Sequence, residues 1–145
     1  MEFENYTERA RGFIQAAQSL ALRSDHQQLT PLHIFKVLMD DREGLASGLI
    51  IQAGGDIQRL AGVVESEFAK IPKVKGSGAG QIYLAPETAR LFEQAQAISE
   101  KAGDSFVTVE RLLLALALAS GTVPARLIAD CGATPQSLNA AINDL

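Results

Sequence analysis

The chain has 145 residues, enough to bury a hydrophobic core in a single domain. Its composition, 47% hydrophobic and 21% charged, is that of an ordinary globular protein, and its net charge of −4 argues against a general nucleic-acid binder. Because it has one cysteine and no apolar run longer than residues 112–119, it can form no intrachain disulfide, and we expect a cytoplasmic protein with no membrane partner.

A repeat with a fixed offset of 78 residues extends through the chain without a gap. Such self-similarity indicates that one supersecondary unit was duplicated. Two copies are too few for an open solenoid, so we expect them to face each other across a pseudo-twofold axis in one domain. The predicted halves are residues 1–70 and 85–145, joined by a linker at 71–84. Identical pairs include Ala17 and Ala95, Thr30 and Thr108, Leu38 and Leu116, Leu49 and Leu127, and Gly54 and Gly132.

The first helix of each repeat is predicted at about residues 7–23 and 86–102. Pro86 is typical of a first helical turn, and Gly103 is typical of the left-handed residue just past a helix end. In the second copy, apolar residues recur at three- and four-residue spacing and predict one buried stripe. The stripe consists of Leu91, Ala95, Ile98 and Ala102.

The remaining helices also come in pairs at the repeat offset. The second helices are predicted to begin at the N-caps Thr30 and Thr108, and the all-apolar residues 112–119 predict a central helix that is buried all round. The third helices should end before Gly54 and Gly132, and the fourth should begin at Asp56 and Thr134. No segment alternates like an amphipathic strand, so the fold class is all-α, with eight helices and no sheet.

Between the two copies, residues 76–80 are rich in glycine and predict a flexible part of the linker. Four leucines at equivalent positions of the two repeats should lie in a shared core. They are Leu38, Leu49, Leu116 and Leu127.

The sequence offers little support for catalysis or for a cofactor. It lacks the G-x-x-x-x-G-K-[ST] pattern of a phosphate-binding loop, so we expect no nucleotide binding by this chain. His26 and His33 belong to different segments, which favours solvated or hydrogen-bonded side chains over metal ligands. Cys131 lies just before a helix-ending glycine and reads as a small buried residue. We therefore expect no metal, no cofactor and no enzymatic activity.

Binding remains the class of function to consider, and the two copies differ most in the loops before their second helices, at residues 25–29 and 103–107. Glu110 follows the second of these loops. Its place near a helix N-terminus is explained equally well by the helix dipole and by a functional role.

The motifs TERA at 7–10, AQSLA at 17–21, TPLH at 30–33 and GDSF at 103–106 make the chain similar to the Clp amino-terminal domain. The segment IPKVKGSG at 71–78 resembles the ClpB type of that domain. The resemblance extends over the whole chain. It implies a module of a hexameric, ATP-driven disaggregase whose ATPase rings lie outside these residues.

The resemblance also implies a role and a site. The domain would engage unfolded or aggregated polypeptides in a surface groove, or dock an adaptor protein as ClpA and ClpC domains do. Positions implicated in substrate handling fall on Thr7, Asp104 and Glu110. Groove positions that are aliphatic in some relatives are here Gln94 and Arg111, while Ile98 keeps the apolar character.

Overall fold

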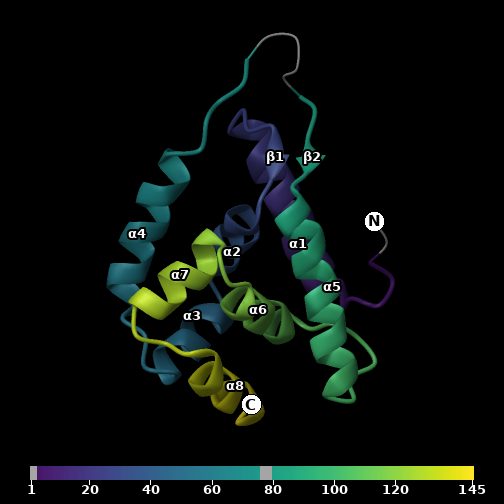
Figure 1. The fold of residues 1–145 in the computed structure, drawn as a ribbon, viewed down its shortest axis with the longest axis vertical. Coiled ribbons are helices and arrows are strands. Elements are labelled where there is room, and N and C mark those ends of the chain that lie inside the picture. Colours follow the sequence, from purple (N-terminus) through teal and green to yellow (C-terminus); the bar gives the residue numbers. More distant parts are fainter. Residues whose placement is uncertain (1–2, 76–79) are drawn as a thin grey trace.

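The computed structural model describes residues 3–75 and 80–145, and over these ranges the chain forms two sets of four α-helices (Figure 1). The prediction of a mostly helical, duplicated fold is therefore confirmed. The first set comprises α1 (Glu8–Arg23), α2 (Pro31–Met39), α3 (Leu45–Gln52) and α4 (Ile57–Ala69). The second comprises α5 (Pro86–Lys101), α6 (Val109–Leu118), α7 (Val123–Asp130) and α8 (Pro135–Asn143).

The helix starts follow the predicted caps. A side-chain oxygen of Thr7, Asp56, Thr108 or Thr134 accepts a hydrogen bond from a backbone amide in the first turn of α1, α4, α6 or α8 respectively, at 3.0–3.3 Å. Each bond satisfies an amide that has no partner within its own helix. Gly103, just beyond α5, has a φ of +82°, the left-handed conformation expected after a helix end.

The two halves meet at a pair of equivalent glycines. A Cβ atom on Gly132 would lie 3.1 Å from the carbonyl oxygen of Gly54, and a Cβ on Gly54 would lie 3.7 Å from the carbonyl oxygen of Gly132. Helices pair across this point in the same reciprocal way, since α3 packs on α8 and α4 packs on α7. The pseudo-twofold axis therefore lies near these glycines, where a side chain on Gly132 would crowd the backbone of Gly54.

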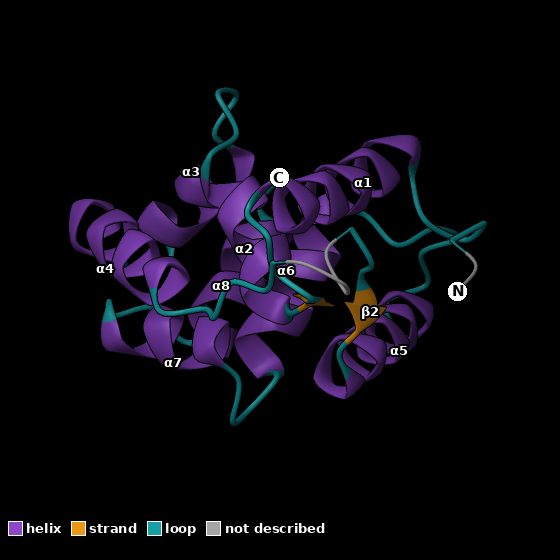
Figure 2. Ribbon diagram, turned by 90° about the horizontal axis from the view of Figure 1, so that it is seen from above, coloured by secondary structure: helices purple, strands orange, loops and turns teal. Residues whose placement is uncertain are grey.

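The expectation of no sheet is wrong in one respect. Strands β1 (Gln28–Leu29) and β2 (Tyr83–Leu84), orange in Figure 2, pair in parallel with Leu29 opposite Leu84. Tyr6 forms an isolated bridge to Val107. The two pairings are equivalent in the 78-residue register. Segments this short show no alternating pattern, because the flanking helices hold them in place and they bury no sheet face of their own.

Backbone hydrogen bonds join both ends of the predicted linker to the first repeat. The backbone N–H of Val74 donates to the carbonyl of Asp25 at 2.7 Å, and that of Tyr83 donates to Gln27 at 2.9 Å. The predicted flexible segment at 76–80 falls mainly on residues 76–79, which lie outside the described residues.

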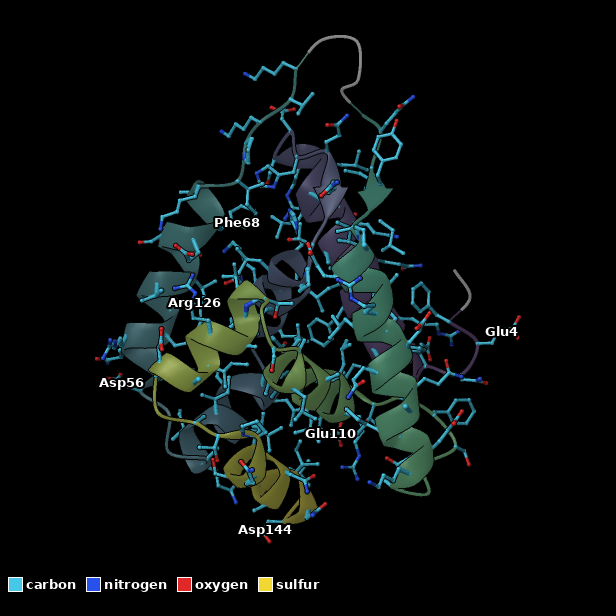
Figure 3. The ribbon with its side chains drawn as sticks, viewed as in Figure 1. Glu4, Asp56, Phe68, Glu110, Arg126 and Asp144 are labelled. Atoms are coloured by element: carbon cyan, nitrogen blue, oxygen red, sulfur yellow. The ribbon has the colours of Figure 1, made fainter. Side chains whose placement is uncertain are left out.

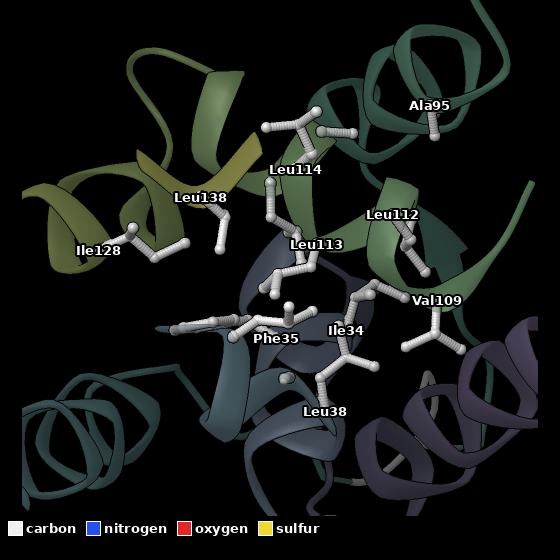
Figure 4. Close-up of a cluster of buried hydrophobic side chains, with 14 of the residues drawn as sticks. Ile34, Phe35, Leu38, Ala95, Val109, Leu112, Leu113, Leu114, Ile128 and Leu138 are labelled. Carbon is white, nitrogen blue, oxygen red and sulfur yellow. The ribbon is translucent and has the colours of Figure 1, made fainter. Parts of the chain in front are cut away.

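The core lies between α2 and α6, where large aliphatic side chains surround Phe35 (Figure 4). Leu38, Leu49, Leu116 and Leu127 are all buried, as predicted. Residues 112–116 of α6 are buried too, but the expectation that 112–119 is buried throughout is wrong, because Leu118 is 40% exposed.

No single helix among the described residues has the length and apolar character needed to cross a membrane. The pair α6 and α7 meets that test only when taken together, and it is bent by 89°.

Candidate functional site

A groove with a volume of about 710 Å³ lies between α5, α6 and α8 on the second repeat. We refer to it below as the groove. Its lining residues include Gln94, Ile98, Lys101, Arg111, Leu114 and Leu118.

Helix α6 supplies the apolar floor of the groove. Arg111, Leu114 and Leu118 follow one another at spacings of three and four residues, so they share one face of the helix. Leu114 is 5% exposed and belongs to the core, while Leu118 is 40% exposed at the edge. The floor therefore grades from buried core to an accessible apolar rim, which is the form of a surface that can receive an apolar side chain.

Helix α5 forms the opposite wall. Ile98 is half-buried and packs against the core, whereas Gln94, one turn earlier, is exposed. The predicted stripe on α5 is confirmed at Leu91 and Ala95 but is wrong at Ala102, which is exposed. Ser99 is buried instead, and its hydroxyl donates to the carbonyl of Ala95 at 2.9 Å, which satisfies a polar group inside the core.

Arg111 is held in place by two polar partners. Its Nε donates to Asp104 Oδ2 at 3.0 Å, and its Nη1 lies 3.5 Å from Asn139 Oδ1 on α8. The Arg111 side chain is 14% exposed, so this partly buried ion pair fixes the guanidinium against the groove wall. Asp104 thus orients a groove residue without lining the groove itself.

The structure brings together four of the six residues predicted for the site. Gln94, Ile98 and Arg111 line the groove, and Asp104 contacts Arg111. Thr7 and Glu110 do not line it. Thr7 caps α1, and its backbone N–H donates to Val107 at 3.0 Å, while Glu110 is an acidic residue in the first turn of α6. The expectation that Glu110 shares the surface of Ile98 is therefore not met by this groove.

Sequence reasoning missed Lys101, Leu118 and Asn139 as groove residues. Leu118 belongs to an all-apolar run, and hydropathy alone does not distinguish its exposed end from its buried part. Comparison of the repeats could have found it, because the equivalent residue in the first copy is the charged Asp40.

The equivalent place on the first repeat is filled by the chain itself. Phe68 lies near the carboxyl end of α4 (Figure 3). Its ring packs against His26 and His33, with ring centroids 5.0 and 5.6 Å away. Lys36 Nζ lies 5.4 Å from the centre of the same ring. These four residues are called the Phe68 cluster below. In the 78-residue register, His33 corresponds to Arg111 and Lys36 to Leu114.

α4 has 13 residues and α8 has 9, and Asn143, the last residue of α8, corresponds to Glu65 in the 78-residue register.

The two histidines, far apart in the predicted elements, form a hydrogen-bonded pair. His26 Nδ1 and His33 Nε2 are 2.8 Å apart, and the backbone N–H of Thr30 donates to His33 Nδ1 at 3.0 Å. Since Nδ1 of His33 accepts, its proton lies on Nε2 and points to His26. The predicted alternative of hydrogen-bonded histidines therefore holds, and both are buried rather than solvated.

Burial keeps this pair neutral. Loss of hydration, followed by the proximity of His26, lowers the pKa of His33 to about 4. Burial also lowers the pKa of His26, with Lys73 acting in the same direction.

Lys36 carries the charge in the Phe68 cluster. Its Nζ donates to Glu65 and, at 2.9 Å, to Asp40. Burial disfavours the ammonium form, but these two carboxylates outweigh it and raise the pKa of Lys36.

Metal and thiol chemistry have little basis in the described residues. Within residues 3–75 and 80–145, no group of three or more His, Cys, Asp or Glu side chains could hold a metal ion. Cys131 is buried, as predicted, and its thiol donates to the carbonyl of Ile128 at 3.2 Å.

Comparisons with known proteins identify the family of this chain. Residues 5–123 match the family described as the Clp repeat (R) N-terminal domain. The Chaperone protein ClpB of Rhodopseudomonas palustris is 61% identical over all 145 residues, and the match covers 100% of this chain and 16% of that protein. The chain thus spans about a sixth of the length of this curated relative.

Solved structures agree on the fold. The Hsp104 N-terminal domain from Candida albicans superposes with a TM-score of 0.82 at 21% identity, covering 95% of this chain and 89% of that one. A ClpV N-domain, solved in complex with a VipB peptide, gives a TM-score of 0.72 at 16% identity over 95% of this chain and 87% of that one. From the family match over residues 5–123 and the ClpB relative, the chain belongs to the Clp repeat N-terminal domain family.

Proposed function

We propose that this chain is the substrate-recognition module of a ClpB-type, ATP-dependent disaggregase and that it engages unfolded or aggregated polypeptide in the groove. The observation that carries the proposal is the groove between α5, α6 and α8, in which buried Leu114 grades into exposed Leu118. An apolar surface rimmed by polar side chains is typical of a site that receives protein segments.

The polar wall gives the groove its character. Gln94, Arg111 and Asn139 present hydrogen-bonding groups beside the apolar floor. A receptor for many polypeptides needs apolar contact for generality and polar groups at its edge for orientation. We propose that Ile98 and Leu118 supply the apolar contact and that Arg111, oriented by Asp104, supplies the polar group at the edge. Thr7 and Glu110 would act outside the groove.

The relatives support a proposal for the rest of the protein. In the whole protein, which we propose to be cytoplasmic and hexameric, ATPase modules elsewhere in the chain would supply the work. The domain itself would need no cofactor, metal or nucleic acid, and it would act as a non-catalytic module that delivers bound segments.

The test is a chemical-shift titration of the isotope-labelled domain with a permanently unfolded protein. We expect shifts to cluster around Ile98, Leu114 and Leu118. Leu118→Gln removes apolar surface at the rim and should weaken binding roughly fivefold. Ile51→Gln is the matched control, because Ile51 on α3 is 54% exposed and lies outside the groove.

Equal weakening by both substitutions, or shifts that cluster away from the groove, would contradict the proposal. Asp104→Ala should also weaken binding, since it frees Arg111 from its orientation. Glu110→Ala should leave binding unchanged.

A second candidate function is docking of a specific partner such as an adaptor. The observation in its favour is the structurally similar ClpV N-domain, which was solved in complex with a VipB peptide. The two functions differ in what binds: a folded adaptor that binds the groove while unfolded proteins do not would favour docking.

A further inference from the structure

Residues 68–74, which we call the strap, are attached to the first repeat at both ends beside the buried histidine pair. The strap begins with Phe68 in the last turn of α4, whose ring lies against the rings of His26 and His33. It ends at Val74, whose backbone N–H donates to the carbonyl of Asp25 at 2.7 Å. The strap is thus held by aromatic contact at one end and by a backbone hydrogen bond at the other.

The facing nitrogens of the histidine pair have fixed roles. The backbone N–H of Thr30 donates to Nδ1 of His33, and Nε2–H of His33 donates to Nδ1 of His26, 2.8 Å away. A proton added to Nδ1 of His26 would set two N–H groups against each other. A proton added to Nδ1 of His33 could donate to the Thr30 hydroxyl, 2.9 Å away, but it would displace the Thr30 amide. The closed arrangement therefore accepts a proton only by losing one of these two hydrogen bonds.

The surroundings of the pair do not compensate an added positive charge. His26 is 5% exposed and His33 is fully buried, and within the described residues neither ring is hydrogen-bonded to a carboxylate. Burial is the largest influence on the pKa of His26 and lowers it; Lys73, in the strap, lowers it further, and Asp25 raises it. An imidazolium here must therefore reach water to be stabilised.

The remaining charges at the Phe68 cluster belong to Lys36 and its two partners. Nζ of Lys36 lies 5.4 Å from the centre of the Phe68 ring and donates to Glu65 and Asp40. Both carboxylates are thus already engaged with a cation, and that cation repels a second positive charge in the cluster.

The strap is the part of the covering that can move at least cost. His33 belongs to α2, whose Ile34 and Phe35 are fully buried in the core. The strap consists of a helix end and the first residues of the linker, and Phe68 is only half-buried. Its movement would leave the rest of α4, with the buried Leu60, in place. Terminal turns of this kind open at a lower free energy than core helices do.

On these grounds we propose that the histidine pair and the strap form an acid-sensitive switch, in which protonation of the pair releases residues 68–74 while the rest of the domain stays folded. Release exposes the ring of Phe68. It also opens a cleft of about 380 Å³ that is lined by Ile71 and Pro72 of the strap together with Leu32 of α2. The first repeat thus gains accessible apolar surface in acid that is covered at neutral pH.

The uptake of one proton on release sets the size of the response. The pKa of His33 is about 4 in the closed form, and the released imidazole has the ordinary value of 6.5. The ratio of released to closed molecules therefore rises by about tenfold for each pH unit below 6.5 and levels off near pH 4. Between pH 7.5 and 4.5 the ratio should grow by about 50- to 100-fold.

Native-state hydrogen exchange of the isotope-labelled domain measures release residue by residue. The reporter is the amide of Val74, which donates to Asp25 only while the strap is closed. After correction for the intrinsic exchange rate, its protection should fall by about 50- to 100-fold from pH 7.5 to 4.5, or to that of an unstructured amide.

Urea separates release from global unfolding. Exchange at Val74 should change little up to about 1 M urea, because release exposes little surface. Exchange of the Leu116 amide, in the centre of α6, requires global unfolding and should accelerate steeply with urea. At pH 4.5, Val74 should still exchange faster than Leu116.

Two variants identify the group that titrates. In His33→Gln, which keeps both hydrogen bonds of the pair, the fall in Val74 protection should be at least about tenfold smaller than in the wild type. Glu65→Gln is the matched control, because it removes a carboxylate of the Phe68 cluster and leaves both histidines in place. Its fall should stay within about threefold of the wild type.

A measurement on the wild type makes the test independent of any variant. Nitrogen-15 shifts of the two imidazoles report their protonation, and this should follow the same pH interval as the exchange of Val74. The inference is overturned by Val74 protection that does not change with pH, by Val74 exchange at pH 4.5 that depends on urea as steeply as that of Leu116, or by an undiminished response in His33→Gln. Loosening of the strap without protonation of either histidine would overturn it as well.

Discussion

Acidification should destabilise the domain through the buried pair of His26 and His33. The folded-state pKa of His33 is about 4, below the ordinary value of 6.5. Between these values the unfolded chain takes up a proton that the folded chain excludes, so stability falls as the pH drops below 6.5 and levels off below about 4. Above pH 6.5 the contribution is complete.

The size of the effect follows from the separation of the two pKa values. The shift of His33 from 6.5 to about 4 corresponds to about 3 kcal/mol of unfolding free energy over the whole window. Most of this, roughly 2–3 kcal/mol, should be lost by pH 4.5. A loss of that size is a large fraction of the stability of a typical domain.

Carboxylates also titrate in this range, so the assay needs a variant that isolates His33. Glutamine suits the site, because its oxygen can accept from the Thr30 amide and its nitrogen can donate to His26 Nδ1, as His33 does. Urea unfolding of the wild type and His33→Gln at pH 7.5, 6.5, 5.5 and 4.5 gives the difference directly. Any constant cost of the substitution cancels in the pH dependence.

The wild type should lose more stability than His33→Gln between pH 7.5 and 4.5, by about 2–3 kcal/mol. Parallel pH profiles would refute the reasoning, since they would mean that His33 does not titrate differently in the folded and unfolded states.

Other substitutions test the packing and the role of the groove. Leu116→Ala, in the centre of α6, should cost about 2–5 kcal/mol in urea unfolding through lost transfer energy and the cavity left behind, and a cost below 1 kcal/mol would mean that the core lies elsewhere. Gly132→Ala should destabilise by about 1–3 kcal/mol more than Gly103→Ala. Both glycines have positive φ, but only Gly132 faces a backbone atom, at 3.1 Å, so equal costs would contradict the close approach. Thr7→Ala should lower stability by about 1 kcal/mol while leaving polypeptide binding in the groove intact, as followed by thermal unfolding and titration. ATP should give no saturable heat in calorimetry at micromolar protein, because the sequence lacks the phosphate-binding loop and its lysine.

Much of the fold was predictable because it depends on signals local in sequence. Thr7, Asp56, Thr108 and Thr134 mark helix starts through their own side chains, and Gly103 marks an end through its backbone freedom. The repeat then supplied what local signals lack, since it relates elements far apart in the chain. It predicted the duplicated arrangement without any knowledge of a contact.

The features that the sequence did not reveal depend on contacts between segments. The pairing of β1 with β2 joins two segments that are far apart in the sequence, and each strand has only two residues, too few to show an alternating pattern. The approach of His26 to His33 requires the turn after α1 to fold back on α2, so their spacing of seven residues indicated no shared site. Leu118 was misplaced because an exposed leucine at the end of a buried run looks like the rest of the run.

The two repeats agree where they contact each other and differ where one of them is open. Gly54 and Gly132 are identical and face each other's backbone, and a Cβ on Gly132 would lie only 3.1 Å from the carbonyl oxygen of Gly54. Arg111, Leu114 and Leu118 differ from their counterparts His33, Lys36 and Asp40, and in the first repeat the ring of Phe68 lies against His33 and Lys36. Contacts at the axis therefore restrict the residue type in both repeats at once, whereas the groove restricts the residue type only in the second repeat. For a duplicated domain of this kind, the positions that have lost the repeat are the ones at which a ligand should be sought.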